Sequence, residues 1–335
     1  MLNLIKKVIK PVCVPGNEGK IADVIAEEIA PYVISCSRDN MGNLIAFVEG
    51  CGENKKKVMF AAHIDEIGFI VTHIEDSGYI RFSTLGGINM TAAAYSQVEF
   101  ETGVVGVLVP DSSAQNPLNA DNCSVDIGAK NKRDAERKVK IGDTFAVKSE
   151  VVKLSGSRVS GRPMDDRIGA VVMIEAMKQI QKPYNDVYFC FTTQEEVGCR
   201  GSKTASYAVM PDIGIALDVT ATGDTLSAKP MEVKLGGGAA IKIKDSSVVC
   251  DRALVQKMRS AAEENKIKFQ FEILTGGGTD TSSMQQTGKG AIAGCISIPT
   301  RYIHSPVETI DLGDVEECIK LTSALCSADF SDICD

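Results

Sequence analysis

The residues best suited to chemistry in this sequence include two histidines that follow apolar runs. His63 follows the apolar run 58–62, and His304 comes shortly after the run 291–298. Such runs predict strands, and ligands bind at the carboxyl ends of strands in α/β sheets. Asp65 shares a strand face with His63, so its carboxylate can orient the imidazole as a metal ligand. A histidine alone is often only hydrogen-bonded structure, and the nearby carboxylate is what favours a ligand role.

Acidic residues stand at three further positions of interest. Asp165 and Asp166 precede a predicted helix, where they could also act only as helix caps. Glu195 and Glu196 follow an apolar run and precede glycines, a pattern that favours a turn at a sheet edge over a solvated acidic pair. Asp218 lies inside an apolar run, where a carboxylate is rarely buried unless it is paired or bound to metal.

Together these side chains have the composition of a site for two divalent cations. Imidazole and carboxylate are ligands that hard and borderline divalent ions prefer. The charges also balance, because two such ions would be neutralised by Asp165, Glu196, Asp218 and one bridging hydroxide. Glu195 is then left over as an uncoordinated base.

The chain has 335 residues, which is long enough for roughly two domains. These domains must supply the helices and strands that position the residues above. Hydrophobic residues make up 44% and the net charge is −8, so the chain lacks the basic surface that binds nucleic acid or anionic membranes. We expect neither a membrane span nor a secretory signal. The eleven cysteines are scattered without a CxxC pair, which favours the reducing cytoplasm over a disulfide framework.

Outside the segment 68–158, helical and strand patterns alternate. This alternation predicts an α/β fold, with a mixed, largely parallel sheet and helices on both faces. The predicted helices are 2–9, 21–33, 168–180, 252–265 and 315–325. The predicted strands are 33–36, 44–48, 58–62, 187–192, 213–219, 269–273 and 291–298.

The segment 68–158 is predicted to be an inserted, small β-barrel-like domain, because short β-rich runs are broken by glycine and polar turns. No helical pattern in this segment is longer than the one at 130–137. The third histidine, His73, lies in this segment and is expected to be structural. The catalytic domain is therefore predicted to be discontinuous, formed by 1–67 and 159–335. The predicted strands of the insert are 69–73, 79–83, 96–101, 104–109 and 144–152.

The order of the motifs resembles that of a known enzyme family, the co-catalytic dinuclear metallo-aminopeptidases of the glutamyl aminopeptidase type. This family includes the tetrahedral (TET) aminopeptidases, the deblocking aminopeptidases and proteins named as endoglucanases. The resemblance covers nearly the whole chain and implies a zinc-peptidase-like fold. The motifs that carry it are His63-x-Asp65, Asp165-Asp166-Arg167, Glu195-Glu196-x-Gly198, Asp218 and Arg301-x-x-His304.

The resemblance implies five protein ligands for two divalent metal ions per chain. Asp165 would bridge the two ions. His63 and Asp218 would complete the first ion, and Glu196 and His304 would complete the second. Zinc is the expected metal, and cobalt or manganese also suits these ligands.

The resemblance also implies two catalytic residues. Glu195 would be the general base that takes a proton from the metal-bridging water and delivers it to the leaving amine. Asp65 would orient His63. Asp166 would shape the local backbone and would not bind metal.

Peptides are the implied substrates, held through the free α-amino group. Arg301 and Asp280 are candidates for substrate binding, and Lys229 is a second basic candidate for an acidic N-terminal side chain. Met164 and Cys199 differ from the residues expected beside these motifs and could alter the shape of the pocket. The preferred N-terminal residue stays open.

The resemblance further implies that dimers assemble into a tetrahedral dodecamer that encloses the active sites, with the segment 68–158 as a main interface. The apolar runs 90–94 and 104–109 are consistent with such an interface, because they exceed what a small exposed β domain should show. They could instead fill the core of the segment itself.

Three alternative functions fit the sequence less well. Metallo-carboxypeptidases and amino-acid deacylases have a similar motif order, but their extra domain follows the last aspartate, whereas here the insert lies between Asp65 and Asp165. An endoglucanase needs carboxylates on both sides of a sugar cleft, and a chain with no Trp and 5% aromatic residues offers few stacking platforms for sugars. A non-enzymatic binding module would not explain why the sequence contains five motifs of the kind that bind metal ions.

Overall fold

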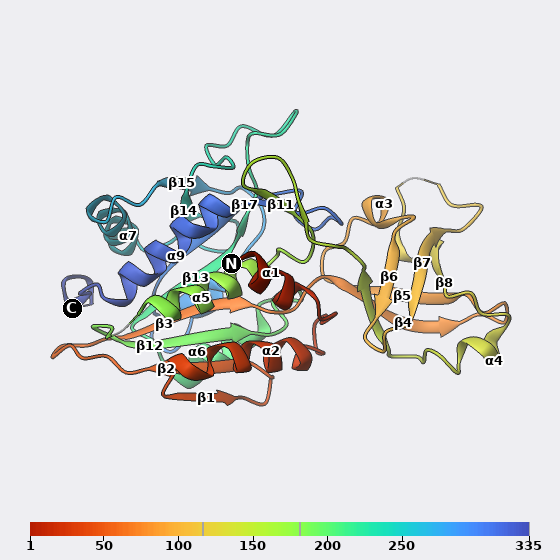
Figure 1. Ribbon diagram of the computed structural model, residues 1–335, viewed down its shortest axis with the longest axis horizontal. Coiled ribbons are helices and arrows are strands. Elements are labelled where there is room, and N and C mark those ends of the chain that lie inside the picture. Colours follow the sequence, from red (N-terminus) through yellow and green to blue (C-terminus); the bar gives the residue numbers. More distant parts are fainter. Residues whose placement is uncertain (116, 181, 335) are drawn as a thin grey trace.

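An eleven-stranded sheet with helices on its faces and a closed six-stranded barrel make up the chain, and the barrel projects from one end of the sheet (Figure 1). The computed structural model describes residues 1–115, 117–180 and 182–334. This architecture confirms the predicted fold class, a largely parallel α/β sheet together with a β-barrel.

Four parallel strands form the centre of the large sheet, in the order β12-β3-β13-β16. All eight residues of β13 are buried, because helices cover both faces of the sheet, and the strand is apolar up to Asp218 near its carboxyl end. Since the four strands are parallel, their carboxyl ends lie at the same edge of the sheet. The bounds are β3 (Lys57–His63), β12 (Asp186–Thr192), β13 (Ile213–Thr220) and β16 (Ile292–Arg301).

Shorter strands extend the sheet on both sides of this centre. Two of them lie beyond β12, namely β1 (Ser35–Arg38) and β2 (Leu44–Val48). Beyond β16 one branch consists of β14 (Ala239–Lys244) and β15 (Phe269–Ile273). The other branch consists of β17 (Thr309–Asp311), β11 (Arg158–Ser160) and β10 (Val152–Lys153).

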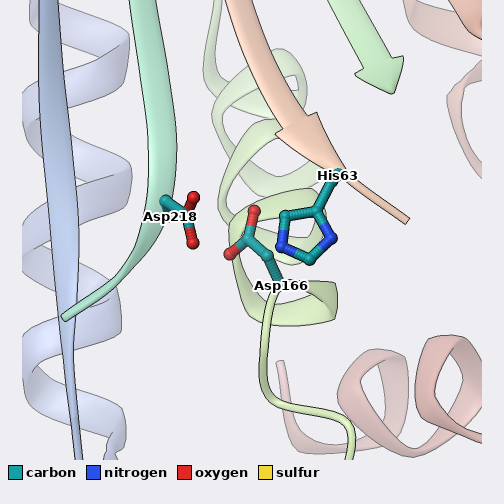
Figure 2. Close-up of side chains that lie close together, drawn as sticks. All are labelled: His63, Asp166 and Asp218. Atoms are coloured by element: carbon teal, nitrogen blue, oxygen red, sulfur yellow. The ribbon is translucent and has the colours of Figure 1, made fainter. Parts of the chain in front are cut away.

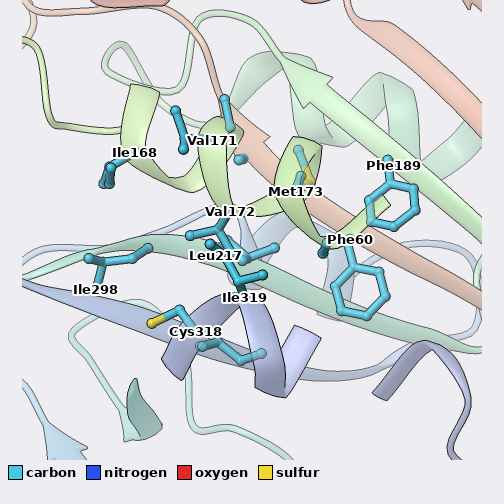
Figure 3. Close-up of a cluster of buried hydrophobic side chains, with 14 of the residues drawn as sticks. Phe60, Ile168, Val171, Val172, Met173, Phe189, Leu217, Ile298, Cys318 and Ile319 are labelled. Carbon is cyan, nitrogen blue, oxygen red and sulfur yellow. The ribbon is translucent and has the colours of Figure 1, made fainter. Parts of the chain in front are cut away.

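Two groups of helices pack on the sheet. Figure 3 shows the core beneath the first group, where Val172 of α5 lies with Leu217 of β13 and Ile319 of α9. No helix in the described ranges is both long and apolar enough to cross a membrane. The first group is α1 (Leu2–Ile9), α2 (Gly19–Ile29), α5 (Arg167–Gln179), α7 (Arg252–Glu264) and α9 (Leu312–Cys326). The second group, on the other face, is α6 (Arg200–Val209) and α8 (Thr281–Gln285).

The barrel closes through antiparallel pairing in the order β4-β5-β8-β7-β6-β9. Its core contains a cluster of aromatic rings, in which Phe145 lies 4.6 Å from Phe100 and 4.9 Å from Phe69 between ring centroids. Such contacts supply the apolar burial that a small barrel needs. The bounds are β4 (Gly68–Ile74), β5 (Ile80–Leu85), β6 (Gln97–Phe100), β7 (Val105–Pro110), β8 (Cys123–Asp126) and β9 (Thr144–Val147).

Several elements differ from the sequence-based expectations. The predicted helix 21–33 ends at Ile29, where a 3-10 turn containing Pro31 follows. The predicted strand 144–152 is divided, and β10 pairs with β11 in the large sheet instead of in the barrel. Helices α6 and α8, and the strands β8, β11, β14 and β17, were not predicted. The remaining short helical segments are α3 (Met90–Ala93), α4 (Lys132–Ala135), Ala30–Tyr32, Ala120–Asn122 and Ser331–Ile333.

Candidate metal centre

A cavity of about 550 Å³ opens at the carboxyl ends of the parallel strands. It lies where α/β sheets bind their ligands. Gly87 of the loop after β5 also borders it, so the barrel contributes to the wall beside the sheet. Six of the residues predicted from the sequence line this cavity, and they are His63, Asp165, Glu195, Glu196, Asp218 and His304.

The lining residues come from strand ends and from the turns that follow them. His63 is the last residue of β3, and Asp218 lies near the end of β13. The turn after β12 carries Glu195 and Glu196 and begins with Gln194 in the left-handed region at φ 55°. His304 lies in the loop after β16 and is also left-handed, at φ 61°. Parallel strand pairing therefore brings together residues that are far apart in the sequence.

Asp165 lies between the two imidazoles. Its Oδ1 is 3.0 Å from Nε2 of His63, and its Oδ2 is 3.2 Å from Nε2 of His304. Nε2 of His304 is also 3.3 Å from Oε2 of Glu196. One carboxylate thus faces a histidine with each of its oxygens, which is the arrangement that a bridging ligand requires.

Two overlapping groups of ligand atoms meet at this point. In the first, one ligand atom each from His63, Asp165 and Glu196 lies within 4.8 Å of the others. In the second, His63, Asp166 and Asp218 meet the same condition, and Figure 2 shows their side chains pointing toward one another. Asp166 is expected from the sequence to shape the local backbone and not to bind metal. Its Oδ1 does accept the N–H of Gly169, at 3.1 Å, at the start of α5.

The cavity concentrates buried carboxylates, and their negative charge favours the binding of cations. Burial raises the pKa of Glu195 and Glu196, and nearby carboxylates raise the pKa of both further. Burial alone would lower the pKa of His304, but hydrogen bonds to Asp165 and Glu196 raise it to about 11. Burial likewise disfavours the charged form of His63, and hydrogen bonds to Asp165 and Asp65 nevertheless raise its pKa well above the usual value.

The donor set fits divalent metal ions. Among the described residues, Oδ2 of Asp166 and Oε1 of Glu196 are buried and have no hydrogen-bond partner. A buried carboxylate oxygen without a partner is costly, so these atoms have unused capacity to coordinate a cation. Imidazole nitrogen and carboxylate oxygen are the ligands that zinc, cobalt and manganese accept.

Asp65 has a broader role than the orientation of His63. Nδ1 of His63 is 3.1 Å from the backbone carbonyl oxygen of Asp65 and 3.5 Å from its Oδ1. The Asp65 carboxylate accepts the backbone N–H of Glu195, at 3.0 Å, and of Glu196, at 3.1 Å. Asp65 therefore holds the turn that carries both glutamates.

Glu308 is a supporting residue that the sequence analysis missed. It is 1% exposed, and its Oε1 accepts the backbone N–H of His304 at 3.0 Å. Its Oε2 accepts the backbone N–H groups of Met164, at 2.6 Å, and Asp165, at 3.1 Å. One carboxylate thus connects the two loops that carry Asp165 and His304. The available signal was a single glutamate immediately before the three-residue strand β17.

The predicted substrate-binding residues lie in different surroundings. The guanidinium of Arg301 pairs with Asp224, with Nη2 at 2.6 Å from Oδ2, and Arg301 is not among the residues that line the cavity. Lys229 is exposed and does not line it either. Asp280 is 2% exposed, and its Oδ2 accepts a hydrogen bond from Thr192 at 2.5 Å.

Of the two residues that departed from the expected motifs, one reaches the cavity. Met164 is fully buried in the core. Cys199 lines the cavity, and its thiol donates to Oε1 of Glu195 at 3.1 Å. Cys199 is left-handed at φ 50° and precedes helix α6.

Comparison with known proteins gives consistent matches along the chain. The family model of the M42 glutamyl aminopeptidases matches residues 42–321. A putative aminopeptidase of Acetivibrio thermocellus is 44% identical over 329 residues, covering 97% of this chain and 98% of that protein. An aminopeptidase structure from the archaeon Desulfurococcus kamchatkensis has a TM-score of 0.94 at 35% identity, covering 97% of this chain and 94% of that one. The TET1 peptidase of Pyrococcus horikoshii, which can assemble into a tetrahedron or a large octahedral shell, has a TM-score of 0.87 at 35% identity, covering 97% and 98%.

Proposed function

Since the chain belongs to the M42 glutamyl aminopeptidase family and is a metal-dependent aminopeptidase, we propose that it uses two divalent metal ions, zinc in the first place, and Glu195 as the general base. The observation that supports two ions best is the position of Asp165, whose two oxygens each face one imidazole. His63 and Asp218 would hold the first ion. Glu196 and His304 would hold the second.

Divalent ions bound here would lower the pKa of a coordinated water and polarise the carbonyl of the scissile peptide bond. Glu195 is the residue that moves the proton. It accepts a proton from the attacking water and delivers it to the leaving amine. Burial raises the pKa of Glu195, which brings a carboxylate closer to the pKa that suits a base at neutral pH. Its backbone N–H is held by Asp65, so the carboxylate is positioned before substrate binds.

The acidic lining of the cavity supports a preference for amino termini. Two bound ions would neutralise Glu196 and Asp218, which leaves Glu195 as the uncoordinated carboxylate of the cavity, and its negative charge attracts a free α-ammonium group. An N-acetylated peptide lacks that charge. The enzyme should therefore remove N-terminal residues and leave blocked peptides intact.

A substrate panel tests this function. The metal-loaded enzyme, prepared separately with zinc, cobalt or manganese, is offered aminoacyl chromogenic substrates and their N-acetylated counterparts. We expect turnover of the free aminoacyl compounds only, and loss of turnover after chelation. Carboxymethyl-cellulose serves as the control for the endoglucanase alternative. Cleavage of cellulose without aminopeptidase activity would contradict the proposal, and preferential hydrolysis of the acetyl group would support a deacylase.

We further propose that residues 68–158 form a domain inserted into a catalytic domain of residues 1–67 and 159–335, and that this insert mediates assembly. The two predicted apolar runs contribute side chains to the barrel core and also leave side chains at the surface. Leu108 and Met90 fill the core of the barrel, while Val105, Val107 and Tyr95 are 43%, 40% and 77% exposed. These exposed apolar side chains are available for contact with another chain.

The assembly proposed for this chain is the tetrahedral dodecamer, by analogy with the Pyrococcus horikoshii peptidase. Such a shell would confine the active sites and protect folded proteins in the cytoplasm, where we place the enzyme. The free thiols from Cys13 to Cys326 support a reducing compartment. Light scattering on metal-loaded protein should give the mass of twelve chains. A mass near 35.8 kDa, that of one chain, would contradict it.

A further inference from the structure

A third group of potential ligands lies next to the two described above. It consists of Glu195, Cys199 and Asp280, each with one ligand atom within 4.8 Å of the others. The thiol of Cys199 is 3.1 Å from Oε1 of Glu195. In a tetrahedral zinc site, with metal–sulfur bonds of about 2.3 Å and metal–oxygen bonds of about 2.1 Å, sulfur and oxygen lie about 3.6 Å apart. The observed spacing needs only small side-chain adjustments to match this geometry.

Asp280 provides a separate reason to expect a ligand. It is 2% exposed, and its Oδ2 is occupied by the hydroxyl of Thr192. Its Oδ1 is buried without a hydrogen-bond partner among the residues that the structure describes. A buried carboxylate oxygen left in this state is unfavourable unless a cation or a donor reaches it.

The chemistry of this group differs from that of the other two. Those combine imidazole and carboxylate, whereas this one contains a thiol, which selects thiophilic ions. Burial raises the pKa of the Cys199 thiol, and the negative charges of Glu195 and Asp280 raise it further. The same negative charges favour a divalent cation, and a metal displaces the thiol proton when it binds. Cys199 also lines the cavity, so an ion can enter from solvent.

We propose that Glu195, Cys199 and Asp280 form an inhibitory site for a thiophilic divalent cation such as Cd²⁺ or excess Zn²⁺. On binding, the thiol proton passes to solvent, and the sulfur and two carboxylate oxygens coordinate the ion without any change of oxidation state. Glu195 then serves as a ligand and no longer accepts the proton of the attacking water. The inhibitory effect rests on the proposed role of Glu195 as the base, whereas the binding of the ion does not.

Cadmium provides a direct probe, because a cadmium–thiolate bond gives an ultraviolet charge-transfer band that imidazole and carboxylate ligands do not. Cd²⁺ is titrated into zinc-loaded enzyme, and both absorbance and aminopeptidase activity are recorded. The test variant is Cys199→Ser, which keeps a hydroxyl donor for Glu195 but removes the soft ligand. Variants of exposed thiols elsewhere, Cys36→Ser and Cys51→Ser, are the matched controls.

We expect a band that saturates at one Cd²⁺ per chain in the parent and in both controls, and that is missing in Cys199→Ser. Inhibition by Cd²⁺ should weaken at least about tenfold in Cys199→Ser. Asp280→Asn should keep the band but require more Cd²⁺, which supplies a second variant with the thiol intact. An unchanged band in Cys199→Ser, or no band in the parent, would overturn the site. A normal band in a protein without aminopeptidase activity would instead count against the proposed function alone.

Discussion

The two histidines of the candidate metal centre are held in different ways. His63 ends a central strand, and its side chain is 2% exposed. His304 lies in a left-handed loop, and its side chain is 34% exposed. Both face the same carboxylate, Asp165. The centre therefore has a buried half built on regular structure and a rim half built on a loop.

This difference indicates how the two halves should bind metal. The buried half is positioned by the sheet itself, since β3 pairs on both sides with β12 and β13. The rim half depends on Glu308, whose carboxylate connects the loops of His304 and Asp165. Ligands held by regular elements stay closer to their productive geometry than ligands on loops. We therefore expect the buried half to bind its ion more tightly.

Replacing the shared ligand should have the largest effect. In Asp165→Ala the bridging carboxylate is lost, and two cations about 3.5–4 Å apart would repel each other without it. We expect at most one metal ion per chain by elemental analysis, and almost no activity. Asp76→Ala, an exposed aspartate of the barrel, is the control. Two tightly held ions in Asp165→Ala would exclude a bridging role.

Replacing each histidine in turn allows the metal affinities of the buried half and the rim half to be compared. His304→Ala should keep one tightly bound ion after dialysis, because the buried half remains complete. His63→Ala should lose that ion and bind the remaining one weakly. Both variants should lose most activity, since the proposed mechanism uses both ions. The measurement is the metal content after dialysis against graded chelator. The reverse order of retention would show that exposure and loop position do not govern affinity here.

Glu195→Gln tests a residue that belongs to neither half. The amide keeps the size of the side chain but cannot accept the proton of the attacking water. We expect a loss of kcat of about 10²-fold or more, the scale of general base catalysis. Metal content should stay at the parent value. If Glu195→Gln instead loses metal and keeps its rate per bound ion, then Glu195 is a ligand.

The smallest of these effects is expected for Glu308→Gln. An amide has one acceptor oxygen, so it can support the loop of His304 or the loop of Asp165, but not both as the carboxylate does. Loss of such a supporting partner typically weakens metal binding about 10–100-fold. Isothermal titration should show a larger loss for the rim ion than for the buried ion, because His304 would bind only the rim ion whereas Asp165 would be shared by both. An equal loss for both ions would mean that Glu308 supports the whole centre.

The sequence predicted the cavity lining well because its residues follow strong apolar strands. His63, Glu195 and Asp218 each lie at the end of such a strand or near it, and parallel pairing brings those ends together. The spacing of the motifs could not predict Glu308, because its three partners are backbone N–H groups and leave no pattern in the side chains. The sequence predicted that Asp65 orients His63. It could not predict that Asp65 also holds the turn of Glu195 and Glu196, because those contacts are again to backbone N–H groups.

Helix α6 was missed because it lacks a stripe of large apolar residues. Helix α6 packs on the sheet through small residues such as Gly201, Ser202 and Ala205, which do not form an apolar stripe. Added bulk would not fit there, since a Cβ at Gly201 would lie 2.3 Å from the backbone oxygen of Thr193. Strand β8 is short, and its place in the barrel follows from pairing with β5 and β7.

The position of the barrel within the chain has a consequence for synthesis on the ribosome. Strand β3 emerges early, but both of its neighbours, β12 and β13, lie beyond residue 185. The barrel strands lie between residues 68 and 147, so the barrel can close while β3 is still unpaired. A closed barrel brings the ends of this segment together and shortens the loop that β3 must later close. Until then β3 is an apolar strand with two open edges, the kind of nascent segment that chaperones shield.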